Sequence, residues 1–349
     1  MNLLNSLQRE PLAGKLPITL ITGFLGSGKT TLLAHLLKHE GMNRAAVVIN
    51  EIGEIGIDHD LVEVSSENIT LLANGCICCT VRTDLQETLR ELFGKRRAGE
   101  IPDFDRVIVE TTGLADPAPV VQTLVSDTML SAHYRLDGII TLVDALNGPA
   151  QLATQPEAQK QVALADRVLV TKTDLVDAAQ TDELMARIAA INRSATIRTV
   201  LHGEIDPSEV TGIGLTSSRA GPHTLRFLGE GREPGSSLLF PKPPVAGHMA
   251  DIQTLSMRFD KPFSWTAFSA AMELLTSMRG PDLLRVKGIV NVDGLPVVVQ
   301  CVQHIFHPPV HLDAWPSADH ATRLVFITRH IREQAIRSLF SAVGDVADA

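Results

Sequence analysis

Residues 18–31 read ITLITGFLGSGKTT, and this stretch decides the fold of the first half of the chain. Its β-branched beginning predicts a buried strand, and a helical pattern follows directly after the last glycine. The spacing matches G-x-x-x-x-G-K-T, in which backbone N–H groups and a helix N-terminus surround a phosphate. The stretch therefore predicts a phosphate-binding loop formed by Gly23, Gly26, Ser27, Gly28, Lys29, Thr30 and Thr31.

Residues of this loop and of a later strand end carry the predicted phosphate chemistry. We expect Lys29 to reach the β and γ phosphates and the Thr30 hydroxyl to bind Mg²⁺. Glu110 ends the predicted strand at 106–110, where an acid would hold the Mg²⁺ shell. The N–H of Gly113 would contact a γ-phosphate and move when that phosphate leaves. Lys29, Glu110 and Gly113 are therefore the predicted catalytic residues, and the alternative for Glu110 is a plain carboxylate in a surface loop.

The segment TKTD at 171–174 indicates which base is bound. A carboxylate at Asp174 would accept the N1 and 2-amino protons of guanine, whereas adenine presents an acceptor at N1. Lys172 would lay its aliphatic stem along the base or sugar. An asparagine usually begins this pattern, so Thr171 is expected to lose an amide that ties the loop together. The segment favours GTP, and the alternative is that Asp174 only caps a following helix.

Three of the four cysteines fall in the segment GCICC at 75–79, which we expect to be a loop after the strand at 69–72. Crowded thiolates suit a soft or borderline ion such as Zn²⁺. Cys76 and Cys78 would converge on one ion, with Cys79 as a third or exchanging ligand, and Glu51 is one candidate for the missing ligand. Buried cysteines or a redox pair are the alternatives.

Cys301 lies in an apolar strand pattern and is expected to be a core residue. His304, His307 and His311 gather near it in the sequence. They are a weaker candidate for a second metal site, and ordinary surface or packed histidines are the alternative.

Alternating strand and helix patterns over residues 16–201 predict a doubly wound, mostly parallel α/β sheet. Several of the strands are apolar nearly throughout, as expected for strands buried on both faces. The predicted strands are 17–22, 45–50, 69–72, 106–110, 138–143, 167–170 and 196–201. The predicted helices are 30–39, 83–93, 117–130, 156–164 and 182–191.

The second half of the chain predicts a smaller α+β domain. Glycine, proline and serine interrupt both periodicities over 212–247, which we interpret as a linker between domains 1–211 and 248–349. The Asp293-Gly294 pair predicts a hairpin turn between two apolar runs. The predicted elements are strands 252–259, 284–292, 296–305 and 324–328 and helices 264–278 and 333–343.

The composition excludes several classes of protein. The 349 residues suffice for about two domains. No apolar run is long enough to span a membrane, which argues against a membrane protein. No signal-peptide core forms near the N-terminus, so we expect a cytoplasmic protein. A net charge of −9 argues against a nucleic-acid partner.

With these motifs in this order, the chain resembles the CobW-like metallochaperone GTPases over residues 16 to the C-terminus. The pattern includes NEIG at 50–53 and ETTG at 110–113, and 284–288 and 323–327 suggest a CobW-type C-terminal domain. The resemblance implies a protein that hydrolyses GTP, binds Zn²⁺, or in some branches cobalt or another transition metal, and transfers it to a client protein. Oligomerisation is also implied.

The leading hypothesis is a metal-delivery GTPase that uses GTP, GDP, Mg²⁺ and Zn²⁺, in which metal affinity depends on the bound nucleotide. No residue that positions the hydrolytic water is evident in the sequence. A nucleotide-regulated zinc sensor or buffer without productive turnover shares every motif. A small-molecule kinase ranks lowest, because the second domain offers no acceptor-activating site.

Overall fold

The computed structural model describes residues 12, 14–50, 62–65, 69–72, 77–80, 84–215, 218–228 and 252–347. These residues form two units. One contains residues 14–185 and 195–214, and the other contains the described residues from 215 onward together with 186–194.

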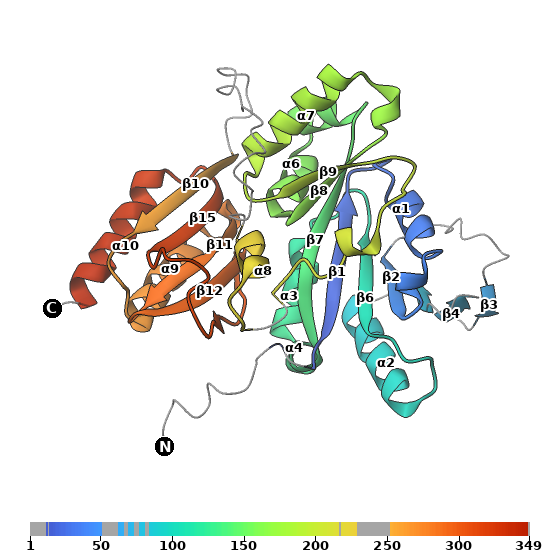
Figure 1. Cartoon of the computed structure of the whole chain (residues 1–349), viewed down its shortest axis with the longest axis horizontal. Coiled ribbons are helices and arrows are strands. Elements are labelled where there is room, and N and C mark those ends of the chain that lie inside the picture. Colours follow the sequence, from blue (N-terminus) through green and yellow to red (C-terminus); the bar gives the residue numbers. More distant parts are fainter. Residues whose placement is uncertain are drawn as a thin grey trace. The chain divides into compact units, whose positions relative to one another are not determined.

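The first unit is built on a nine-stranded sheet in the order β3-β4-β5-β2-β6-β1-β7-β8-β9 (Figure 1). From β5 to β9 in this order every pairing is parallel, whereas β4 pairs antiparallel with both β3 and β5. The strands are β1 (Leu16–Gly23), β2 (Ala45–Asn50), β3 (Val62–Ser65), β4 (Ile69–Leu72), β5 (Ile77–Thr80), β6 (Arg106–Thr111), β7 (Tyr134–Asp144), β8 (Arg167–Thr171) and β9 (Thr196–Val200).

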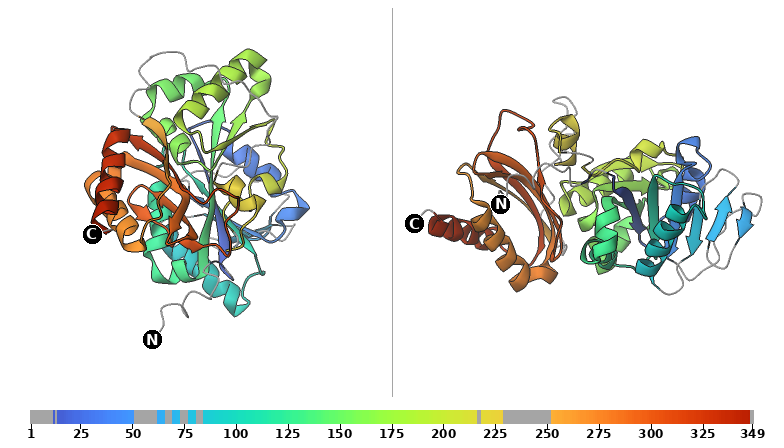
Figure 2. Two further views of the ribbon diagram at one scale, coloured as in Figure 1. Left: turned by 60° about the vertical axis from the view of Figure 1, so that its left-hand side comes forward. Right: turned by 90° about the horizontal axis from the view of Figure 1, so that it is seen from below.

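Helices cover both faces of this sheet, as the two turned views show (Figure 2). Ile140 and Leu142 of β7 belong to the core cluster that includes Leu32 of helix α1. Thr141, between them, donates its hydroxyl to the carbonyl oxygen of Gln161 on helix α6 at 2.8 Å. Because neighbouring residues of a strand point to opposite faces, α1 and α6 lie on opposite faces. The predicted doubly wound fold is confirmed.

The helices of this region are α1 (Lys29–Leu36), α2 (Leu85–Ala98), α3 (Ala118–Ser126), α4 (Thr128–His133), α5 (Gly148–Thr154), α6 (Pro156–Leu164) and α7 (Ala178–Ile191). The sequence predicted one helix over 117–130, and the structure breaks it at Asp127. The backbone of Asp127 is extended, and its carboxylate accepts the N–H of Leu130 at 2.8 Å as the cap of α4. A capping aspartate thus starts a second helix where helical periodicity alone continues.

The second unit has a six-stranded antiparallel sheet in the order β10-β15-β11-β12-β13, with β14 paired to β12. Phe268 and Met272 of α9 and Phe340 of α10 pack on it, in one cluster with Val286 and Phe326. The elements are β10 (Ile252–Phe259), α9 (Trp265–Arg279), β11 (Leu283–Val292), β12 (Leu295–Val302), β13 (Ile305–Phe306), β14 (Val310–His311), β15 (Thr322–Arg329) and α10 (Glu333–Ala347).

The predicted hairpin joins β11 to β12, and both turn residues have positive φ, 50° at Asp293 and 90° at Gly294. The predicted single strand over 296–305 is wrong, because the chain turns back at Gln303, where φ is 54°. Val302 then pairs with Ile305 in an antiparallel ladder.

Part of the segment predicted as a linker is helical, namely α8 (Pro222–Phe227). Phe227 and Leu228 join a core cluster with Ile289 of β11 and Val298 of β12. The predicted domain boundaries themselves stay a prediction.

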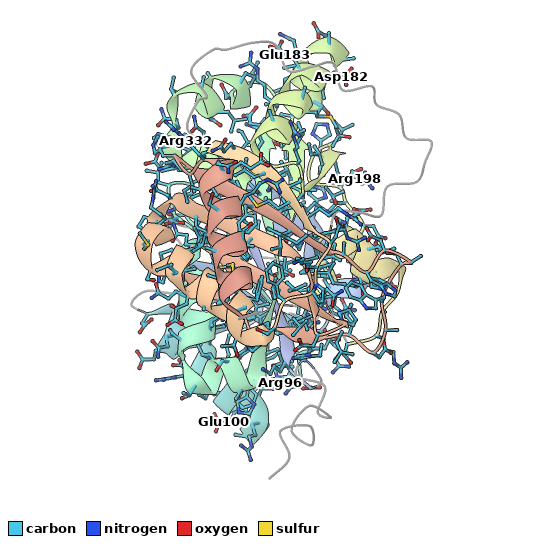
Figure 3. The ribbon with its side chains drawn as sticks, turned by 90° about the vertical axis from the view of Figure 1, so that its left-hand side faces the viewer. Arg96, Glu100, Asp182, Glu183, Arg198 and Arg332 are labelled. Carbon is cyan, nitrogen blue, oxygen red and sulfur yellow. The ribbon has the colours of Figure 1, made fainter. Side chains whose placement is uncertain are left out.

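Within the described part of the chain, no helix has both the length and the apolar character needed to cross a bilayer. The side chains of Asp182, Glu183 and Arg198 stand out from the fold and are exposed (Figure 3).

Candidate functional site

The predicted phosphate loop connects β1 to α1, as the sequence requires. Gly23 has φ 146°, and a Cβ atom there would lie 2.5 Å from the carbonyl oxygen of Leu142. Gly26 and Gly28 have φ of 75° and 94°, and Gly28 is the N-cap of α1. Side chains at these three positions would be strained or would clash. The glycines therefore set the path that turns the chain from the strand into the helix.

Lys29 and Ser27 lie inside this loop and are buried. The Lys29 ammonium donates to the carbonyl oxygen of Gly23 at 3.0 Å and to that of Phe24 at 3.5 Å. The Ser27 hydroxyl has no hydrogen-bond partner among the described residues. Because a buried hydroxyl without a partner is costly, an unpaired Ser27 oxygen in the loop fits a site built for a polar ligand.

Thr30 and Glu110 meet at the carboxyl edge of the sheet. The Thr30 hydroxyl donates to Oε1 of Glu110 at 3.4 Å, and Glu110 is 1% exposed. Directly after Glu110 on β6, the Thr111 hydroxyl donates to the Thr22 hydroxyl at 2.8 Å, which joins β6 to β1. The hydroxyl and the carboxylate predicted to bind one ion are thus neighbours. Thr31, also predicted for the loop, follows on α1 and is exposed.

Gly113 lies directly against the phosphate loop. A Cβ atom built on Gly113 would be 2.8 Å from the backbone nitrogen of Leu25 and 2.5 Å from its Cδ2 atom. Only a residue without a side chain allows this approach of the two backbones. The structure therefore brings Gly113 to the loop, as its predicted role requires.

The predicted base-binding loop leaves the end of β8. Lys172 has φ 57°, and Asp174, which belongs to the short 3-10 turn Thr173–Leu175, is exposed. Thr171 lacks the amide expected to tie this loop, but its hydroxyl makes a tie in its place. The Thr171 hydroxyl is buried and donates to the carbonyl oxygen of Ser27 at 2.8 Å. The loop after β8 is therefore fixed to the phosphate loop by a hydroxyl where an amide was expected.

Asp144, at the end of β7, is a site residue that the sequence analysis missed. Its Oδ2 atom accepts the Lys172 ammonium at 2.7 Å, and its Oδ1 atom accepts the backbone N–H of Leu146 at 2.8 Å. Burial acts to raise the pKa of Asp144, but hydrogen bonds from Lys172, Asn147 and Leu146 outweigh it and hold the pKa below its usual value. An acid directly after the apolar run at 138–143 was the available signal.

The cysteine segment differs from the expectation, since Ile77–Thr80 is strand β5 rather than loop. Cys79 pairs with Val48 of β2 on one side and with Ile69 of β4 on the other. Ile49 of β2 is level with both Thr80 and Glu110. The cysteine strand therefore ends at the same edge of the sheet as Glu110, with β2 between them. Cys76 and Glu51 lie outside the described residues.

The weaker histidine site is not found. Among the described residues, no group of three or more His, Cys, Asp and Glu side chains is arranged to hold a metal ion, and His304, His307 and His311 are described. Cys301 is fully buried, as predicted, and burial raises the pKa of its thiol to about 12.

The CobW/HypB/UreG nucleotide-binding domain matches residues 17–199, and the CobW C-terminal domain of cobalamin synthesis proteins matches residues 252–344. The chain belongs to the CobW/HypB/UreG family. The zinc chaperone YjiA of Escherichia coli is a relative, 37% identical over 331 residues that cover 93% of this chain and 98% of that protein. The zinc chaperone CobW of Pseudomonas aeruginosa is 31% identical over 364 residues, which cover 92% and 90% of the two proteins.

A solved structure of this CobW/HypB/UreG family has the same fold. The crystal structure of Zn(II)-bound YjiA GTPase from E. coli aligns with a TM-score of 0.73 and 33% identity, over 94% of this chain and 99% of that one. The resemblance predicted from the sequence is confirmed. The roles of the individual site residues stay predictions.

Proposed function

We propose that this chain is a GTP-hydrolysing zinc chaperone whose affinity for Zn²⁺ depends on the bound nucleotide. Relatives that match nearly the whole chain are named zinc chaperones, and one is named a GTPase. One observation carries the coupling: strand β5 with Cys78 and Cys79 ends level with Glu110, one strand away across β2. Two strand spacings, from β6 across β2 to β5, are about 10 Å. A change near the nucleotide at β6 therefore reaches the cysteine strand through β2 alone.

Hydrolysis at this site is a transfer of the γ-phosphoryl group to water. The water oxygen bonds to the γ-phosphorus, the bond to the β–γ bridging oxygen breaks, and GDP and phosphate leave. The Lys29 ammonium contacts two loop carbonyls, and in this proposal it neutralises the charge that develops on the phosphate oxygens. The backbone N–H groups at the start of α1 add a favourable dipole.

The pair of Thr30 and Glu110 fits a magnesium ion. A hydroxyl and a carboxylate oxygen 3.4 Å apart at one sheet edge are the hard oxygen donors that Mg²⁺ prefers. Thr30 would bind the ion directly and Glu110 would hold its water shell. When bound, Mg²⁺ supplies positive charge beside the β and γ phosphates.

The base-binding loop after β8 selects guanine. Asp174 is exposed and available to the N1 and 2-amino protons. Lys172 is held by Asp144 at 2.7 Å, which fixes the stem that would lie along the base or sugar.

Zinc is the cargo in this proposal. Cys76, Cys78 and Cys79 supply thiolates, and Glu51 is the candidate for a further ligand. An incomplete thiolate site exchanges its ion faster than a closed tetrahedral site, which suits delivery. The recipient is a client metalloprotein. We place the protein in the cytoplasm, where thiols stay reduced, and include self-association in the proposal.

The experiment that tests the metal site is a double substitution, Cys76→Ala with Cys78→Ala. Zinc affinity should fall strongly, because two thiolates are lost, while GTP affinity stays within about twofold. Cys301→Ala is the matched control, since it removes a buried thiol from the other unit. Unchanged zinc affinity in the double variant contradicts the site.

Single-turnover hydrolysis separates the chaperone from a sensor or buffer. A chaperone of this kind should release phosphate from GTP at a rate that depends on Zn²⁺, and the GTP and GDP forms should differ in zinc affinity. Binding of both ligands without any metal-dependent phosphate release favours the sensor.

A further inference from the structure

Two neighbouring residues of α6 hold the loop that follows β6. The Gln161 side-chain amide donates through Nε2 to the carbonyl oxygen of Gly113 at 3.2 Å and to that of Ala115 at 3.1 Å. The Lys160 ammonium contacts Oδ2 of Asp116 at 2.5 Å. We call Gln161 and Lys160 the α6 tether. It fixes the loop at three positions, through two carbonyls and one carboxylate.

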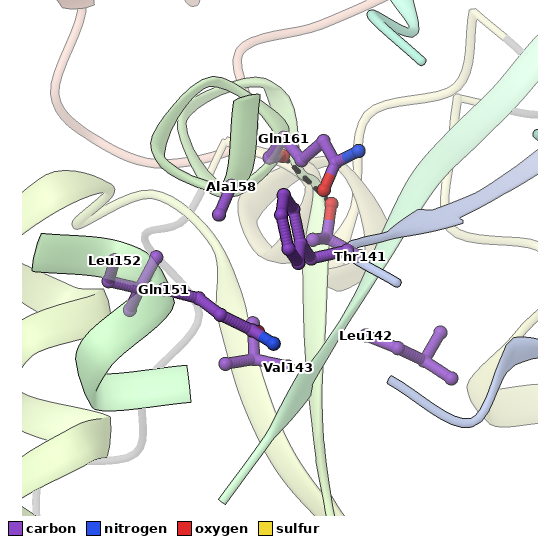
Figure 4. Close-up of a pocket in the computed structure, with 8 residues that line it drawn as sticks. Thr141, Leu142, Val143, Gln151, Leu152, Ala158 and Gln161 are labelled. Carbon is purple, nitrogen blue, oxygen red and sulfur yellow. Dashed lines mark hydrogen bonds between the residues drawn. The ribbon is translucent and has the colours of Figure 1, made fainter. Parts of the chain in front are cut away.

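Gln161 is held in place by its surroundings. It is 1% exposed and lines a small cavity, next to Phe24 of the phosphate loop (Figure 4). The Thr141 hydroxyl fixes its backbone carbonyl, as the dashed line in Figure 4 marks. Its Oε1 atom has no hydrogen-bond partner among the described residues.

The lining of this cavity is mostly apolar, so the polar amide of Gln161 is not needed to fill it. Five of the eight lining residues are apolar, so the cavity would accept an apolar side chain in place of Gln161; they are Phe24, Leu142, Val143, Leu152 and Ala158. An unpaired buried amide oxygen destabilises the fold. The hydrogen bonds of the side chain all go to the loop after β6, as far as the described residues show. The amide therefore serves the loop rather than the packing of the cavity.

The tethered loop touches the phosphate loop on its other side. Gly113 packs so closely on Leu25 that a Cβ atom would be 2.8 Å from the Leu25 nitrogen. The position of the Gly113 backbone relative to the phosphate loop is therefore set from both sides, by Leu25 and by Gln161. A terminal phosphate bound in the loop would be next to this backbone.

We propose that Gln161 is a positioning residue that holds Gly113 where its N–H meets the γ-phosphate. The α6 tether therefore raises the affinity for GTP and leaves the affinity for GDP unchanged. This inference rests on the proposed GTPase function. The Lys160–Asp116 ion pair holds the same loop at the residue directly after Ala115, and so helps to fix the position of Gly113. Because GDP has no γ-phosphate, its binding does not depend on Gly113.

The test is Gln161→Leu, measured as the dissociation constants of GDP and of a non-hydrolysable GTP analogue. Loss of the amide should weaken the GTP analogue about fivefold to tenfold, the effect of one or two hydrogen bonds, and leave GDP within about twofold. Gln151→Leu is the matched control, because Gln151 of α5 lines the same cavity from another wall. It should change neither constant.

Lys160→Ala provides a second variant with the same readout, since it removes a half-buried ion pair and leaves the cavity intact. It should weaken the GTP analogue about twofold to threefold and spare GDP. Equal shifts for the two nucleotides, or no shift in either variant, overturn the tether. A parent protein that binds GDP but no GTP analogue overturns the proposed function together with the tether.

Discussion

The Thr171 hydroxyl offers a sharp test of how the two nucleotide loops are joined. Thr171→Val keeps the shape of the side chain and removes only the donor, which lies 2.8 Å from the carbonyl oxygen of Ser27. Thr171 is 6% exposed, so water cannot easily replace the lost hydroxyl. The carbonyl of the phosphate loop then loses its link to the end of β8.

The magnitude follows from the burial of this hydrogen bond. Leaving a buried acceptor without its donor costs about 1–3 kcal/mol of folding stability. If about 1–2 kcal/mol of that loss must be restored when a nucleotide orders the two loops, the dissociation constant rises about fivefold to thirtyfold. GDP is the proper probe, because its binding does not involve the contact expected at Gly113.

Urea unfolding and a fluorescent GDP titration measure the two effects separately. Thr141→Val is the matched control, because that buried hydroxyl also donates to a backbone carbonyl at 2.8 Å but on α6. Both variants should lose similar stability, and only Thr171→Val should weaken GDP. Equal GDP affinities in the two variants would refute the link between the loops.

Two further predictions concern groups whose pKa is displaced. The pKa of Asp144 in the folded protein is below its usual value of 3.8, so the unfolded state binds the proton first as the pH falls. The stability that this carboxylate contributes is fully present above about pH 4 and is lost as the pH falls through the lower pKa of the folded state. Acid titration of stability should therefore show a shallower loss in Asp144→Asn, and an unchanged slope counts against the assignment. Cys301 is buried with a thiol pKa of about 12, so a disulfide reagent at pH 8 should not modify it in the native protein. Cys301→Ala should give the same native thiol count as the parent and one thiol fewer in urea, and a lower native count would contradict this burial.

The parts of the fold that the sequence predicts well are those with strong local patterns. Strand β2 and helix α6 have the predicted bounds, and the phosphate loop lies between β1 and α1 as predicted, with positive φ at its glycines. Local periodicity and turn chemistry suffice there, because burial on both faces and the need for an unhindered backbone leave a direct mark on residue choice.

The parts that the sequence does not predict depend on distant contacts. Strand β5 has four residues and is defined by its neighbours β2 and β4, while its cysteines were interpreted as a ligand loop. The hydroxyl of Thr171 meets Ser27 across 144 positions of the chain, and Gln161 meets Gly113 across 48. A glutamine in a helix is typical of a surface position, so no local pattern indicates its role.

Strand β5 forms a seam, since it runs parallel to β2 on one side and antiparallel to β4 on the other. Among the described strands, β3 and β4 join the rest of the sheet through this seam. Because the pair of β3 and β4 is attached to the sheet along this one strand, it can separate locally while the parallel strands stay paired. If Cys78 and Cys79 hold zinc as proposed, the hydrogen–deuterium exchange rates of the β3 and β4 amides would report the release of the metal separately from the turnover of GTP.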